Sequence, residues 1–169
     1  MSCWPRPGWD ETTVKVRKSI QIEAPPERVL EVLLDVHRLG EWVQAHRSIV
    51  EEPEGEMREG STFRQKLRVG GLSFKVRWTV TELDAPRQVE WLGDGPGGSD
   101  ARVCYSLAPA DGGTAFEYVN EFHLPGGKLA EAAGKAIGED RAAEEAETSL
   151  RALKELVERE DGRKTTSRG

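Results

Sequence analysis

The chain has 169 residues and a formal net charge of −6. This length is close to one average domain, and it buries enough apolar surface to fold without disulfide or metal staples. The acidic balance argues against a general nucleic-acid-binding protein. No apolar run reaches the length of a membrane span or forms a signal core, and two cysteines are too few for a disulfide framework. We therefore expect one cytoplasmic domain with no nucleic-acid partner and no stable membrane insertion.

The N-terminal quarter predicts an arm, a strand and two small helices. Residues 1–13 contain two prolines and two tryptophans without periodicity, and we interpret them as a flexible arm. Apolar residues alternate from Val14 to Ile22, which is typical of a strand. After two prolines, an apolar face from Val29 to Leu34 predicts a short helix, and Asp35 to Trp42 predicts a second one.

The middle of the chain predicts an antiparallel sheet. Apolar and polar residues alternate in six segments that short turns separate, at about 49–52, 62–69, 74–81, 89–91, 103–107 and 116–122. The short spacings imply a meander with one apolar and one solvated face. Arg102 and Glu121 fall on the solvated side and are expected to be surface charges.

A glycine motif between two of these segments needs a separate interpretation. Gly93, Gly95 and Gly98 satisfy the dinucleotide-binding pattern GxGxxG. That pattern requires a following helix in a parallel strand–helix–strand unit, whereas here Pro96 interrupts the loop and a strand follows. We interpret the loop as a turn.

The C-terminal part predicts one long amphipathic helix. From about Lys128 to Glu158 there is no proline, and apolar residues recur in steps of three and four. Residues 159–169 are interpreted as a disordered polar tail. The first half of the helix carries mostly alanine and glycine, whereas the facing sheet carries large aromatic side chains. This size difference indicates either close packing or an internal cavity.

The order of elements resembles a known superfamily. The run IQIEAPPERVLEVLLDVHRLGEW (20–42), the segments at 80–91 and 101–122 and the terminal helix are similar to the START-like (SRPBCC) superfamily, in particular its polyketide cyclase/dehydrase family. The resemblance covers residues 14–158. It implies an α+β helix-grip fold: a curved seven-stranded antiparallel sheet around a long C-terminal helix, two small helices between strands 1 and 2, and a hydrophobic cavity between sheet and helix.

The candidate ligand-binding residues are the large and polar side chains assigned to the inner face. Gln65 and Asn120 share a face with aromatic neighbours, so they either bind a ligand or pair with other protein groups. We expect the ligand-binding residues to be Trp42, Phe63, Gln65, Phe74, Trp78, Trp91, Tyr105, Phe116, Tyr118, Asn120 and Phe122.

Two functions remain open at this point. The first is a carrier or binding protein that encloses a lipid-like, polyketide-like or aromatic small molecule. The second is a cofactor-independent cyclase, aromatase or dehydratase that uses the same cavity, with Asp140 and Tyr118 as candidate proton-transfer groups. The three histidines have no metal-ligand spacing, so neither a metal nor another cofactor is expected. A homodimer is an open alternative.

Overall fold

The structure, a computed structural model, describes residues 13–69, 71–123 and 139–167. In these parts of the chain, seven strands form one antiparallel sheet in the order β1-β7-β6-β5-β4-β3-β2. The strands are β1 (Thr13–Ile22), β2 (His46–Glu51), β3 (Thr62–Val69), β4 (Leu72–Asp84), β5 (Gln88–Asp94), β6 (Asp100–Ala110) and β7 (Gly113–His123). The helices are α1 (Pro26–Leu34), η1 (Val36–Arg38), α2 (Leu39–Trp42), η2 (Pro96–Gly98) and α4 (Glu139–Ser167).

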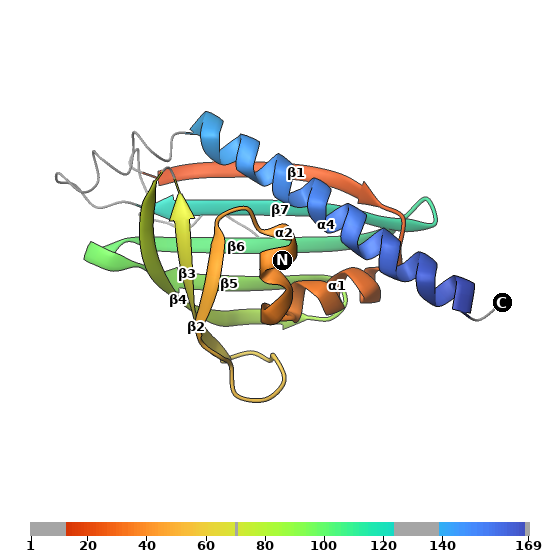
Figure 1. Ribbon diagram of the computed structural model, residues 1–169, viewed down its shortest axis with the longest axis horizontal. Helices are drawn as coiled ribbons and strands as arrows, with labels where there is room; N and C mark the ends of the chain where they lie inside the picture. Colours follow the sequence, from red (N-terminus) through yellow and green to blue (C-terminus); the bar gives the residue numbers. More distant parts are fainter. Residues whose placement is uncertain (1–12, 70, 124–138, 168–169) are drawn as a thin grey trace.

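The arrangement is the predicted helix-grip fold. Figure 1 shows a curved sheet with α4 lying obliquely across one face, and α1 and α2 on that same face. The two small helices stand between β1 and β2 in the chain, as expected. The Asp35 carboxylate caps the short helix η1 between them, because its Oδ1 accepts a hydrogen bond of 3.1 Å from the His37 amide.

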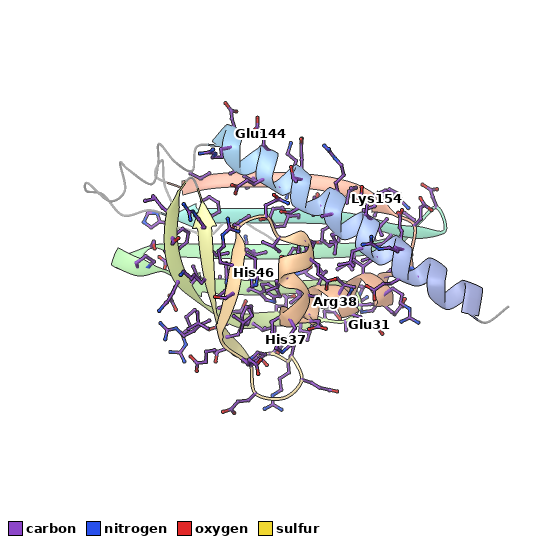
Figure 2. The ribbon with its side chains drawn as sticks, viewed as in Figure 1. Glu31, His37, Arg38, His46, Glu144 and Lys154 are labelled. Carbon is purple, nitrogen blue, oxygen red and sulfur yellow. The ribbon has the colours of Figure 1, made fainter. Side chains whose placement is uncertain are left out.

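Helix α4 is anchored by its second half. Leu150, Leu153 and Val157 are buried with residues of α1 in the main hydrophobic core. The helix ends at Ser167, beyond the end predicted at Glu158, so most of the segment interpreted as a disordered tail is helical. Two ion pairs join this extension to the region of the small helices. The Arg38 guanidinium donates a hydrogen bond to the Glu160 carboxylate, and Arg28 Nε lies 3.9 Å from Asp161 Oδ1. Figure 2 shows Arg38 on the small-helix side of α4. The predicted helix start, at 128–138, lies outside the described residues.

Charges on the outer face of the sheet are buried, which corrects the expectation for Arg102 and Glu121. These side chains are 3% and 2% exposed, respectively. Arg102 Nε donates a 2.7 Å hydrogen bond to Glu90 Oε2, and Arg102 Nη1 lies 3.6 Å from Glu121 Oε1. Strand alternation identifies the face of a side chain, but it does not say whether that face is open to water. The pairing offsets the desolvation that burial imposes on these charges.

Cys104 lies on the same outer face, where it is fully buried and disulfide-bonded. The cytoplasmic location stays a prediction.

Gly93 lies within strand β5 and makes room for a neighbouring indole. Its register partner in β4 is Trp78. A Cβ at Gly93 would meet Val76 Cγ1 at 2.7 Å and Trp78 Cζ3 at 2.8 Å. The chain then passes through η2 directly into strand β6, so the GxGxxG sequence does not form a dinucleotide-binding unit. The glycine here serves packing.

We predict that Gly93→Ala destabilises the protein by about 1–3 kcal/mol, because the added methyl group overpacks the space that the Trp78 ring fills. Urea denaturation measures this change. The matched control is Gly162→Ala in α4, where a Cβ meets nothing within 4 Å. The control should raise stability by up to about 1 kcal/mol through helix propensity. Equal effects of the two substitutions would contradict this account.

Candidate functional site

A cavity of about 180 Å³ lies between α4, α2 and the concave face of the sheet. Its walls are mainly aromatic and aliphatic. The lining residues are Val16, Leu39, Trp42, Val43, Ala45, Gln65, Leu67, Phe74, Val76, Trp78, Trp91, Gly95, Ser99, Asp100, Ala101, Val103, Tyr105, Tyr118, Asn120, Phe122, Ala142, Glu145, Ala146, Ser149 and Leu150. The small side chains Ala142 and Ala146 face the sheet aromatics, which is the size difference that the sequence indicated.

The structure brings most of the predicted binding residues together on this wall. The predicted residues that line the cavity are Trp42, Gln65, Phe74, Trp78, Trp91, Tyr105, Tyr118, Asn120 and Phe122. Phe63 and Phe116 do not line it and are almost fully buried. Phe63 packs edge-on against Trp91, with ring centroids 5.4 Å apart, and Phe116 stacks on Tyr105 at 5.6 Å. These two rings therefore support the wall.

The aromatic wall is a connected set of ring contacts. Trp91 packs edge-on against Tyr105 with centroids 5.5 Å apart, and it contacts Trp78 at 6.2 Å. Tyr105 in turn contacts Tyr118 at 5.7 Å and Trp42 at 6.2 Å. Edge-to-face and offset contacts of this kind each stabilise by about 0.5–1.5 kcal/mol beyond area burial, so the wall holds its shape.

Gln65 is already paired within the protein. Trp78 Nε1 donates to Gln65 Oε1 at 2.9 Å, and Gln65 Nε2 lies 2.8 Å from His46 Nδ1. The amide is the donor in the second bond, so the His46 ring accepts at Nδ1 and is neutral. Burial and the neighbouring Arg47 lower the pKa of His46, which agrees with a neutral ring. Of the two roles considered for Gln65, the structure shows pairing with other protein groups.

We predict that Trp78→Phe costs more in wild-type protein than in a Gln65→Met background. In the wild type the substitution leaves Gln65 Oε1 buried without a donor, at a cost of about 1–3 kcal/mol beyond lost ring contacts. A double-mutant cycle measured by urea denaturation gives the coupling directly. Additive effects, within about 0.5 kcal/mol, would show that the hydrogen bond contributes nothing.

Three polar atoms of the cavity residues have no partner among the described residues. They are Trp42 Nε1, Trp91 Nε1 and Asn120 Oδ1, all buried. The Asn120 amide nitrogen is used, because it donates a 2.7 Å bond to the Tyr118 hydroxyl. A buried polar atom without a partner costs about 1–3 kcal/mol, so each of these positions lowers the stability of the fold.

The two tyrosines of the wall are protonated at neutral pH. Burial raises the pKa of Tyr118 to about 12, with a smaller raising effect from Glu145 and a lowering effect from the Asn120 hydrogen bond. Burial also raises the pKa of Tyr105 well above its usual value, and Tyr118 adds to that shift. A phenol with so high a pKa donates hydrogen bonds but is a poor general base.

The carboxyl group on the cavity wall is Glu145, and the expectation that Asp140 faces the cavity is wrong. Asp140 is exposed and does not line the cavity. The inner stripe of α4 runs through Ala142, Ala146 and Leu150, and Asp140 lies about 200° around the helix from Ala142. Glu145 is half-buried between two stripe positions. Its spacing of three from Ala142 was the sequence signal that could have identified it.

Glu145 is shifted toward its neutral form. Partial burial raises the pKa of its carboxyl, against the lowering effect of Arg141 and Arg47. An acid whose pKa is raised by folding destabilises the fold as the pH rises through the ordinary glutamate value toward the shifted one. Below both values the group is protonated in both states and has no effect.

We therefore predict that Glu145→Gln raises the midpoint of urea unfolding at about pH 7, and that this gain disappears near pH 4, around the ordinary glutamate pKa. The control is Glu144→Gln, at an exposed neighbour on the first turns of α4 (Figure 2). The control should show no such pH-dependent gain. A Glu145→Gln protein less stable than wild type at neutral pH would contradict the shift.

Other classes of site are not formed by the described part of the chain. No group of three His, Cys, Asp or Glu side chains among these residues is placed to hold a metal ion. No helix within them is long and apolar enough to cross a membrane.

The fold and cavity define a START-like helix-grip protein with an internal, largely apolar pocket. The chain belongs to the polyketide cyclase/dehydrase and lipid transport family, whose family model matches residues 13–158. Among relatives, the uncharacterized protein Rv1546 of Mycobacterium tuberculosis is 29% identical over 145 residues, covering 83% of this chain and 96% of that protein. The toxin Rv0910 of the same organism is 25% identical over 115 residues, covering 68% of this chain and 78% of that protein.

Solved structures share the fold. The Zhui aromatase/cyclase from Streptomyces sp. R1128 superposes with a TM-score of 0.68 at 18% identity, covering 87% of this chain and 94% of that one. The protein TTHA0849 from Thermus thermophilus also gives a TM-score of 0.68, at 20% identity, covering 85% of this chain and 96% of that one. At these identities the likeness concerns the fold.

Proposed function

We propose that the protein binds a hydrophobic small molecule in the cavity between α4 and the sheet, as a carrier or binding protein. The family supports a hydrophobic ligand-binding fold. The observation that carries the proposal is the aromatic and aliphatic wall around an internal cavity of about 180 Å³. An apolar pocket with a few polar groups is the usual form of a small-molecule site.

The titratable groups favour binding over catalysis. Asp140 is too far around α4 to reach the cavity, and the Tyr118 phenol keeps its proton at neutral pH. The Gln65 amide is already hydrogen-bonded to Trp78 and His46.

A cyclase- or dehydratase-type enzyme is the second candidate, and Glu145 is the observation that favours it. This carboxyl lines the cavity, and its raised pKa brings it closer to the range in which acids and bases transfer protons. If the protein is an enzyme, Glu145 is the group to transfer a proton, and Tyr118 donates a hydrogen bond to the reacting oxygen.

We predict that Ala146→Phe abolishes binding by filling the cavity from the helix side. The probe is p-isopropyltoluene, and calorimetry measures its dissociation constant. Wild type should bind it, and Ala146→Phe should weaken binding at least tenfold. The matched control is Thr148→Phe, an exposed position on the same helix that does not line the cavity, and it should bind as the wild type does. Ala146→Leu adds less volume and replaces the first variant if that one fails to fold.

The two candidate functions are separated by the compound that the protein carries. Native mass spectrometry of the protein from its own host should detect a bound small molecule. For a carrier, that molecule is released unchanged after prolonged incubation. Conversion of it by wild type, lost in Glu145→Gln at unchanged affinity, establishes the enzyme instead. If neither the probe nor any host compound binds, the cavity proposal is wrong.

A further inference from the structure

A strip of basic side chains lies on the outer face of β3 and β4. The inner face of these two strands lines the cavity, with Gln65, Phe74 and Val76 among its residues. Because successive side chains of a strand point to opposite faces, the residues between them point away from the cavity and from the helices (Figure 1). These outward residues include five exposed cations, which we call the basic strip: Arg64, Lys66, Arg68, Lys75 and Arg77.

The register of the sheet places like charges of the basic strip directly opposite one another. Arg64 of β3 pairs with Arg77 of β4, and Lys66 pairs with Lys75. Like charges at opposite positions destabilise a sheet, so folding gives no reason for this arrangement. Protection of a sheet edge is a common reason for exposed basic residues, but it does not explain the cations of β4, because β4 lies between β5 and β3.

The basic strip has no counter-charge within the described part of the chain. Its five cationic groups form no ion pair with any described residue, although Glu51 and Asp94 are register partners of the strip on the neighbouring strands. The whole chain has 24 basic and 30 acidic residues, so the rest of the molecule is more acidic than the net charge of −6 indicates. The strip is therefore a positive region on an otherwise acidic molecule, and an anionic surface attracts this face.

The shape of the basic strip fits a flat anionic layer. Outward side chains along one strand are about 6.8 Å apart and neighbouring strands about 4.8 Å apart, so the five cations form an array about 13 Å long and two strands wide. All of them project from the same face of the sheet, so they can contact several phosphate groups at the same time. Each Lys or Arg near an anionic lipid surface strengthens binding about fivefold, and clusters of four to eight are typical of such contacts.

We propose that the basic strip docks the protein on an anionic lipid membrane, with the outer face of β3 and β4 against the headgroups. The contact is peripheral and electrostatic, without insertion. It goes beyond the proposed function, because the strip lies on the opposite face of the sheet from the cavity and does not require it. Docking places a binding protein for hydrophobic compounds at the surface where such compounds dissolve.

Sedimentation with lipid vesicles tests the docking. One set of vesicles contains phosphatidylcholine alone, and the other contains phosphatidylcholine and phosphatidylglycerol in equal parts. Wild type should bind the anionic vesicles at low salt and should not bind the neutral ones. High salt should release the protein, because salt screens the attraction between exposed charges.

Paired substitutions identify the surface that binds. Lys66→Gln with Lys75→Gln should weaken binding to the anionic vesicles by about ten- to thirtyfold. The control is Arg151→Gln with Arg159→Gln, which changes the net charge equally at exposed positions of α4 and should bind nearly as wild type does. The strip variant should be at least as stable to urea as wild type, because it removes a like-charge pair. It should also bind p-isopropyltoluene as wild type does, since the cavity is unchanged.

The docking proposal is wrong if wild type does not bind the anionic vesicles at low salt, or if the strip and control variants lose binding equally. It is also wrong if polyglutamate binds through the strip while the vesicles do not, and the partner is then an acidic protein. All three results leave the proposed function as it stands. Arg64→Gln with Arg77→Gln replaces the first strip variant if that one fails to fold.

Discussion

The cavity depends on a difference in side-chain size between α4 and the sheet. On the helix, Ala142 and Ala146 line the cavity with small side chains, and the sheet lines the same cavity with Trp78, Trp91 and Tyr105. One helical turn later, Leu150 and Leu153 restore ordinary packing. The same amphipathic stripe therefore does two things: its second half holds the fold together, and its first half leaves room.

This division explains why the apolar wall keeps its shape without filling the space. Ring-to-ring contacts run from Trp78 through Trp91 and Tyr105 to Tyr118, and buried rings on the neighbouring strands support them. Collapse of the cavity would require several of these contacts to break together. The Trp78–Gln65–His46 hydrogen bonds fix the side near β2 in the same way. Rigidity on both sides reduces the ordering that a ligand must impose when it binds.

Much of the fold followed from periodicity, and the errors have physical causes. Alternation in the strands and the three–four spacing of the C-terminal helix are direct consequences of backbone geometry, so both were readable. Alternation did not show whether a side chain on a given face is exposed or covered. Phe63 and Phe116 point inward but lie against other rings, and Arg102 and Glu121 point outward but are buried. The sequence predicted Asp140 on the cavity wall where the structure places Glu145, and this error has another cause. Each residue turns a helix by about 100°, so a small error in the assumed helix phase changes which side chains face the cavity.

The contact between Gly93 and Trp78 has a consequence that extends to other sequences with this fold. The indole occupies the space where a side chain at residue 93 would begin, so the two positions share one volume on neighbouring strands. A chain with a residue larger than glycine at position 93 needs a residue smaller than tryptophan at position 78. Such a pair would change together during divergence, and the exchange would move bulk from the cavity wall into the sheet. A family of pockets of different width could arise in this way from one unchanged backbone.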